Sequence, residues 1–206
     1  LADGGYQYGP VIVDTFKGKE DVIKPVDPSK ALNFTETAPT LGNAIIKSEW
    51  PEFTPFALNA NGNNAAYSMQ WTKDKLYVAI DTDDTTVVTG EWGSGDTIVL
   101  NFNPVKGGNI QTTRSDADAN PYFYRMIFYR QADGCWMIDS DMYGNNSFKG
   151  NKAVDFTTGE NANVKVYGNV DSDSHAQFIA EIDWSVFGLD PVQVGNTMKL
   201  SYGFLY

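Results

Sequence analysis

Cysteine and histidine are almost absent from this chain of 206 residues, and each scarcity excludes a class of chemistry. The only cysteine is Cys135, so the chain forms no internal disulfide, and a chain of this length buries enough surface to fold without one. The only histidine is His175, and one histidine with one cysteine disfavours a zinc site. We expect Cys135 to be a small buried side chain and His175 to be a solvated loop residue.

Basic residues are also few, with 15 Lys and Arg against 26 Asp and Glu, for a net charge of −11. Such an acidic chain repels phosphate backbones and anionic membrane surfaces, and it contains no stripe of basic residues. No apolar run approaches the roughly 20 residues that a membrane helix needs. We therefore expect no nucleic-acid partner and no membrane insertion.

Catalytic motifs are absent as well. No phosphate-cradling glycine motif precedes a helix, and no strand–turn–helix nucleophile elbow is present. A Ser-His-Asp set would have to use His175, which lies in the turn "DSDSHAQF". We therefore expect no enzyme activity from the domain itself, although its many carboxylates leave glycoside hydrolysis open.

Short alternating segments fill most of the chain. Residues 64–71 ("NAAYSMQW") and 76–81 ("LYVAID") alternate apolar and polar side chains around a polar turn, which predicts an antiparallel hairpin. Similar patterns predict strands at 96–103, 122–130, 134–139, 163–170, 176–184 and 197–206. The only short helical candidate is "WSVFG" (184–188). The prediction is an all-β fold, an antiparallel β-sandwich with long loops and little helix.

The first 36 residues differ from the rest in sequence pattern. They are irregular and are broken by Pro25 and Pro28, which is typical of an extension or linker, and "GPVIVD" (9–14) could form an edge strand. We therefore divide the chain into an N-terminal extension, residues 1–36, and one β-sandwich domain, residues 37–206.

Carboxylates cluster at turns, at residues 81–84, 114–118, 139–141 and 170–174. Calcium takes several oxygen ligands, and Asp side chains in loops supply them. The candidate ligands are Asp83, Asp84, Asp171 and Asp173. None of these segments is an EF-hand loop, so a structural calcium site and a set of solvated acidic turns both stay open.

Aromatic residues divide into two groups. We expect a core position for those in or beside patterned segments, which are Trp50, Trp71, Trp136 and Trp184. Trp92 differs because the glycines of "EWGSGD" (91–96) favour exposure. The segment "NPYFYRMIFYR" adds tyrosines and arginines, namely Tyr122, Tyr124, Tyr129, Arg125 and Arg130. Exposed aromatic faces beside hydrogen-bonding groups suit sugars, whose rings have an apolar face and a polar rim.

The order of four segments resembles that of family 9 carbohydrate-binding modules. These segments are "APTLGNAIIKSEWPEFTPFAL", "AYSMQWTKDKLYVAIDTDD", "EWGSGDTIVLNFNP" and "FIAEIDWSVFGLDPVQVGNTMKLSYGF". The resemblance covers roughly residues 38–206. It implies an immunoglobulin-like or jelly-roll β-sandwich of the broader DOMON-like group, often calcium-bearing and often appended to secreted polysaccharide-degrading enzymes.

The resemblance also implies roles for single residues. Trp92 matches a tryptophan that stacks on sugar, and Arg125 matches an arginine that binds sugar hydroxyls. Val99 stands where sugar-binding members have a glutamate, so one acceptor is missing. Tyr122 and Tyr124 complete our expected sugar site.

The resulting expectation is noncatalytic binding of an oligosaccharide or polysaccharide by a secreted, periplasmic or cell-surface protein. Other domains of a larger secreted protein are expected partners. A structural or adhesion module with a lost sugar site is the first alternative. A haem-binding DOMON relative is a second and weaker one, which His175 and the five methionines permit without favouring it, and we expect no haem.

Overall fold

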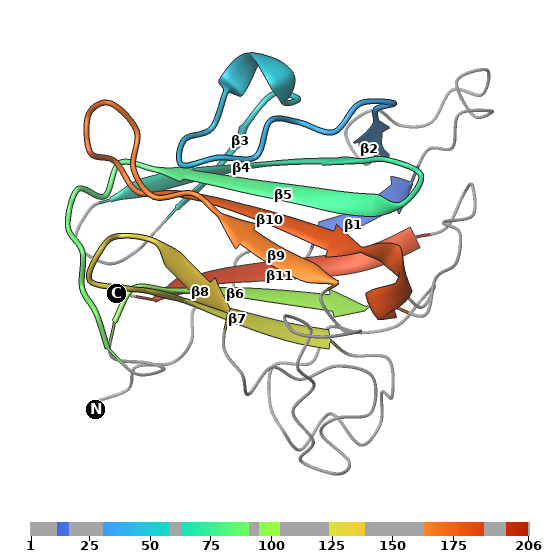
Figure 1. Ribbon diagram of the computed structural model, residues 1–206. Coiled ribbons are helices and arrows are strands. Elements are labelled where there is room, and N and C mark those ends of the chain that lie inside the picture. Colours follow the sequence, from blue (N-terminus) through green and yellow to red (C-terminus); the bar gives the residue numbers. More distant parts are fainter. Residues whose placement is uncertain are drawn as a thin grey trace, which may run out of the picture.

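Figure 1 shows a computed structural model of the chain, which describes residues 12–16, 31–57, 63–90, 95–103, 124–138, 163–187 and 197–205. Strands make up most of these residues. They are β1 (Ile12–Phe16), β2 (Ala31–Phe34), β3 (Thr54–Ala57), β4 (Asn64–Trp71), β5 (Lys75–Thr82), β6 (Thr97–Asn103), β7 (Tyr124–Arg130), β8 (Trp136–Ile138), β9 (Val164–Tyr167), β10 (Gln177–Asp183) and β11 (Thr197–Leu205). Two short 3₁₀ helices, η3 (Lys47–Glu49) and η6 (Trp184–Phe187), complete the elements.

The strands form two facing sheets. Sheet A has the order β8-β7-β6-β11-β1, and sheet B has the order β2-β4-β5-β10-β9, with β3 paired to β4. The sheets join through parallel pairing of β1 with β2, so β1, from the N-terminal 36 residues, lies between β11 and β2. The predicted all-β sandwich with little helix is therefore confirmed (Figure 1). No helix among the described residues is long and apolar enough to cross a membrane.

The predicted hairpin is β4–β5, in which Met69 pairs with Val78 and Trp71 pairs with Leu76. These inward side chains join the core between the sheets because alternate residues of a strand point to the same face. The core also contains Trp136 on β8 and Trp184 at the start of η6. The core prediction is thus confirmed for these three tryptophans, and Trp50 is buried as well, in a second hydrophobic cluster.

The fourth tryptophan, Trp50, is buried on the outer face of sheet B. Residues 38–53, which we call the strap, run across this face, as Figure 1 shows above β4 and β5. Trp50 and Ile45 of the strap pack against Tyr77 and Ile179 of the sheet. The strap also receives hydrogen bonds, including one from the backbone N–H of Gly168 to the carbonyl of Gly42, at 3.0 Å.

Candidate binding site at one end of the sandwich

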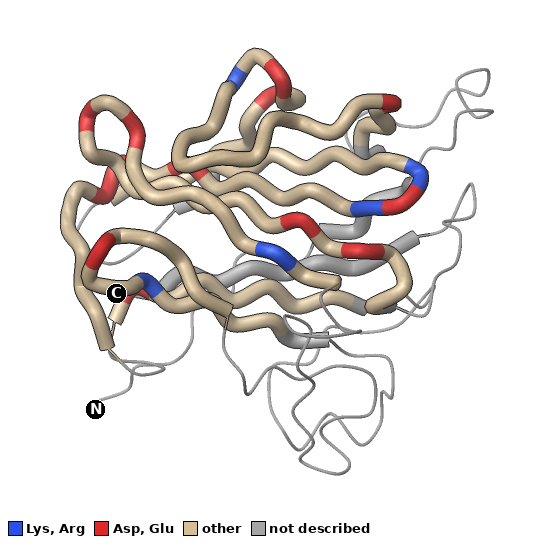
Figure 2. The backbone as a smooth tube through the Cα atoms, in the orientation of Figure 1, with Lys and Arg blue, Asp and Glu red and all other residues tan. Residues whose placement is uncertain are grey.

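Four chain segments meet at the left-hand end of the sandwich in Figure 1. They are residues 83–90 after β5, 95–96 before β6, the 131–135 turn after β7, and the 168–176 turn between β9 and β10. We call this the Arg130 end. Backbone bonds join two of its segments, because the N–H of Ala176 donates to the carbonyl of Asp84 (2.7 Å) and that of Thr82 donates to the carbonyl of Ala176 (3.1 Å). Figure 2 shows that several acidic residues lie along the loops of this end.

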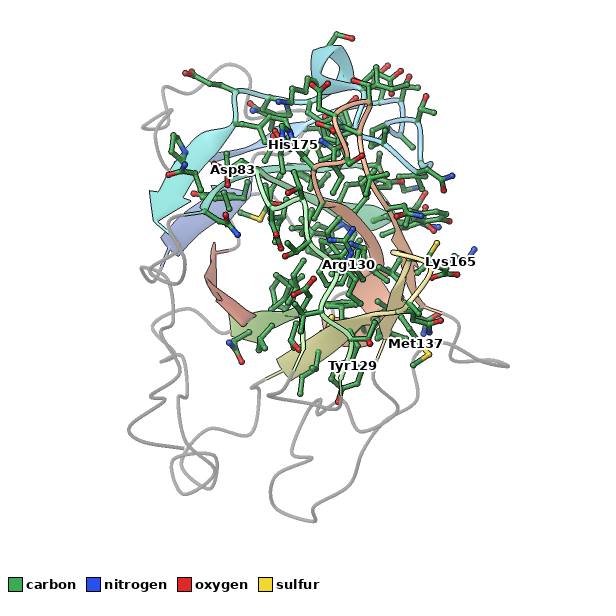
Figure 3. All side chains as sticks on the ribbon, turned by 90° about the vertical axis from the view of Figure 1, so that its left-hand side faces the viewer. Asp83, Tyr129, Arg130, Met137, Lys165 and His175 are labelled. Atoms are coloured by element: carbon green, nitrogen blue, oxygen red, sulfur yellow. The ribbon has the colours of Figure 1, made fainter. Side chains whose placement is uncertain are left out.

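Arg130, the last residue of β7, is buried at the centre of this end, and its side chain is 1% exposed. Its guanidinium donates to carbonyls of three different segments: Nε to Gly134 (3.0 Å), Nη1 to Thr86 (3.4 Å) and Nη2 to Asn169 (3.3 Å). It also lies over the ring of Trp136, 5.5 Å from the ring centroid. In Figure 3, which views this end directly, Arg130 lies near the middle of the sandwich. One side chain therefore connects three loops.

Two buried carboxylates accompany the guanidinium. Asp96 Oδ2 lies 3.8 Å from Arg130 Nη1, and Asp84 is 1% exposed. Asp84 Oδ2 and Asp96 Oδ1 are buried without a hydrogen-bond partner, which is rare for buried carboxylate oxygens. Burial raises the pKa of Asp96, and the negative charge of Asp84 raises it further, against the N–H of Val88 and the charge of Arg130. Burial likewise lowers the pKa of Arg130, against the attraction of both carboxylates.

The turn between β9 and β10 holds a second polar group. Asp171 Oδ1 accepts the backbone N–H groups of Asp173 (2.8 Å) and His175 (2.9 Å), and its Oδ2 lies 3.3 Å from His175 Nδ1. Burial raises the pKa of Asp171, but these backbone hydrogen bonds and the imidazole outweigh it and hold that pKa below its usual range. One ligand atom from each of Asp171, Asp173 and His175 lies within 4.8 Å of the other two. His175 is partly exposed, as expected for a loop residue.

The four predicted calcium ligands lie at this same end but do not form one group among the described residues. Asp171 and Asp173 meet His175, as above. Asp83 instead accepts the backbone N–H (2.5 Å) and Nδ2 (2.7 Å) of Asn64, although Figure 3 shows it close to His175. Asp84 Oδ1 accepts the N–H and hydroxyl of Thr86. Two carboxylates fit part of a calcium shell, which takes six to eight oxygens.

The predicted sugar-binding residues are only partly within the described chain. Trp92 and Tyr122 lie outside the described residues. Tyr124 and Arg125 begin β7, where their backbones pair with Phe102 and Asn101. Arg125 precedes Arg130 by five positions along the strand, a distance of about 17 Å. The structure therefore places Arg125 at the opposite end of β7 from Arg130.

Sequence reasoning grouped Arg130 with exposed sugar-binding residues, whereas the structure buries it. A signal for burial was present in the alternation of β7, because Met126, Phe128 and Arg130 fall on one face and the first two are core residues. Asp96 carried no such signal, because its partners come from segments remote in sequence.

Comparison with known proteins finds likeness in structure but not in sequence. No protein-family profile and no curated protein matches the chain. A family 9 carbohydrate-binding module from Caldicellulosiruptor kristjanssonii, solved in complex with cellotriose, superimposes with a TM-score of 0.52 at 12% identity, over 84% of this chain and 75% of that chain. The structure of such a module from the same organism in complex with glucose gives a TM-score of 0.50 at 11% identity over the same shares. The chain therefore has the β-sandwich fold of family 9 carbohydrate-binding modules.

Proposed function

We propose that this domain is a noncatalytic carbohydrate-binding module that binds an oligosaccharide or polysaccharide at the Arg130 end. The observation that carries the proposal is the fold, which is shared with modules solved in complex with cellotriose and glucose. Loops on a rigid β-scaffold are the usual place for binding residues, and this end has several such loops. We further propose that the domain works outside the cytoplasm within a larger secreted protein.

In this proposal the main contact is aromatic stacking by Trp92. The segment "EWGSGD" that contains Trp92 ends at Asp96, and Asp96 belongs to the Arg130 end. An indole offers a flat apolar face to the C–H face of a pyranose ring, and neighbouring polar groups bind the ring hydroxyls. Val87 and Val88, which precede this segment, are both 42% exposed and extend the apolar surface.

Val99 implies that this domain makes a different hydrogen-bonding contact to sugar from that of modules with a glutamate at this position. Val99 is 4% exposed and pairs with Ile127 across β6 and β7. A buried valine supplies no acceptor to a hydroxyl, so hydrogen bonding at the Arg130 end has to come from loop residues, because Arg125 and Tyr124 lie at the opposite end of β7. The proposal therefore includes a weaker sugar site than one that contains the glutamate.

The test is calorimetric titration of the domain with cellotriose and glucose, preceded by a glycan array to find better ligands. Trp92→Ala should weaken binding roughly thirty-fold, because it removes a stacking surface worth on the order of 2 kcal/mol. The same change should alter the free energy of unfolding by about 0.5 kcal/mol or less if the indole is exposed. Met137→Ala is the matched control, since Met137 is an exposed apolar residue on β8.

Three outcomes would contradict the proposal. A large loss of stability in Trp92→Ala would mean that the indole is buried. Absence of binding to every glycan would favour the structural or adhesion alternative. Turnover of aryl glycosides that disappears on mutating a single carboxylate would identify an enzyme instead.

A further inference from the structure

The connection between β5 and β6 is closed at its base by two hydrogen bonds. The backbone N–H of Asp96 donates to the carbonyl of Val88 at 2.7 Å, and the N–H of Val88 donates to Asp96 Oδ2 at 3.2 Å. The intervening chain therefore leaves and returns at one point of the Arg130 end. A side chain and a backbone group of Asp96 both take part, so the base has a defined geometry.

Gly95 makes this base tighter than any other residue would allow. A Cβ atom at Gly95 would lie 2.5 Å from the backbone N of Gly90 and 2.7 Å from the carbonyl oxygen of Val88. Such distances are far inside van der Waals contact, so a larger residue would push the two sides of the base apart. The sequence thus specifies a close approach of residues 88–90 to residue 95.

Arg130 fixes this base relative to the other loops. Its Nη1 contacts the carbonyl of Thr86 and lies near Asp96 Oδ2, while Nε and Nη2 hold the carbonyls of Gly134 and Asn169. Because its side chain is only 1% exposed, Arg130 has almost no surface to offer a ligand. A guanidinium holds partners in several fixed directions at once, which the single ammonium of a lysine does not reproduce.

We propose that Arg130 is a positioning residue for ligand binding: through Asp96 and the carbonyls of Thr86, Gly134 and Asn169 it holds three loops of the binding end in one arrangement. The inference rests on the proposed function, because it assumes that the ligand binds at this end. Without this fixed arrangement the loops have to be ordered when ligand binds, and that ordering weakens affinity.

The first test compares Arg130→Lys with the parent domain in two measurements. Cellotriose, or the best ligand from the array, should bind on the order of tenfold more weakly, at a temperature well below the melting transition. Hydrogen exchange should become faster at the amides of Val88, Asp96 and Asn169, with little change at the amides of the β4–β5 hairpin. A role in global stability alone would leave the affinity of the folded domain unchanged.

Gly95→Ala is the second variant, because it disturbs the same base without changing a charge. It should reproduce the loss of affinity and the faster exchange at Val88, whereas Met137→Ala should reproduce neither. Normal affinity in both Arg130→Lys and Gly95→Ala, for a ligand that Trp92→Ala fails to bind, would overturn the positioning role and leave the proposed function intact. If no sugar binds the parent domain, the proposed function fails. Unchanged hydrogen exchange in Arg130→Lys would then refute the role of Arg130 in holding the three loops.

Discussion

Arg130 and Trp50 are the centres of two buried regions outside the shared core, and the two are stabilised by opposite means. Arg130 holds loops through a guanidinium, backbone carbonyls and nearby carboxylates. Trp50 holds the strap on sheet B through apolar contact with Tyr77 and Ile179, and its own indole N–H is buried without a hydrogen-bond partner. A buried polar region loses stability when any one hydrogen-bonding partner is removed, whereas an apolar region tolerates replacement of a side chain by another of similar volume. Substitutions should therefore affect the two regions unequally.

The largest expected effect is that of Arg130→Met. The change leaves Asp96 and Asp84 as buried charges without their cation, and it removes the donors to three carbonyls. Removing one partner of a buried ion pair destabilises a protein by about 3–5 kcal/mol. Urea unfolding at neutral pH measures the loss of stability. A loss below about 1.5 kcal/mol would mean that this polar region is no more sensitive to substitution than the strap.

A calcium ion, which we propose from the acidic turns, would add to the stability of the Arg130 end. An ion bound only by the folded state at 100 times its Kd contributes about 2.7 kcal/mol, or roughly 5–10 °C in melting temperature for a domain of this size. We expect this shift between excess calcium and chelator, and a smaller one in Asp173→Asn. Asp74→Asn, in the turn between β4 and β5, is the control. Equal melting temperatures with calcium and with chelator would exclude such an ion.

The strands were predictable because their signal is local. The two-residue period of residues 64–71 and 76–81 sets which side chains point inward, and a turn of three residues sets their pairing. The Arg130 end was not predictable in the same way, since its guanidinium joins Thr86, Gly134 and Asn169, and only the folded topology brings these together. Among the four predicted calcium ligands, the hydrogen bonds from Asn64 to Asp83 likewise depend on the pairing of β4 with β5 and have no local sequence signal.

Single tryptophan-to-phenylalanine substitutions compare the two buried regions through smaller expected changes in the free energy of unfolding. Trp136 Nε1 donates to the carbonyl of Gln177 at 2.8 Å, and its ring lies beneath Arg130. Trp50 Nε1 has no such partner. We therefore expect Trp136→Phe to reduce the free energy of unfolding by about 1–2 kcal/mol more than Trp50→Phe does, since only the first change leaves a buried acceptor unpaired. Urea unfolding of the two variants side by side checks this, and equal losses would contradict it.

The smallest expected effect concerns a partly buried ion pair on the outer face of sheet B. Lys75 Nζ lies 2.7 Å from Glu181 Oε1, with the two side chains 31% and 10% exposed. Because Lys75 is partly exposed and solvent screens the pair, it contributes about 0.5–1 kcal/mol, less than the fully buried Arg130. Lys75→Met should therefore cost about that much at neutral pH. Lys165→Met is the control, because Lys165 Nζ is 3.9 Å from the same oxygen and its side chain is 54% exposed.

The effect of Lys75→Met on stability should also change with pH in a defined direction. Burial lowers the pKa of Lys75, but the hydrogen bond and the negative charge of Glu181 outweigh it, so the pKa is raised above 10.5 in the folded state. A group whose pKa is raised on folding contributes stability that is complete below its unfolded pKa and is lost as the pH rises through its folded pKa. The difference between the parent domain and Lys75→Met should therefore stay constant from pH 7 to about 10 and shrink above that. A difference that instead grows as the pH rises from 8 to 10 would mean that desolvation, rather than Glu181, dominates the pKa of Lys75.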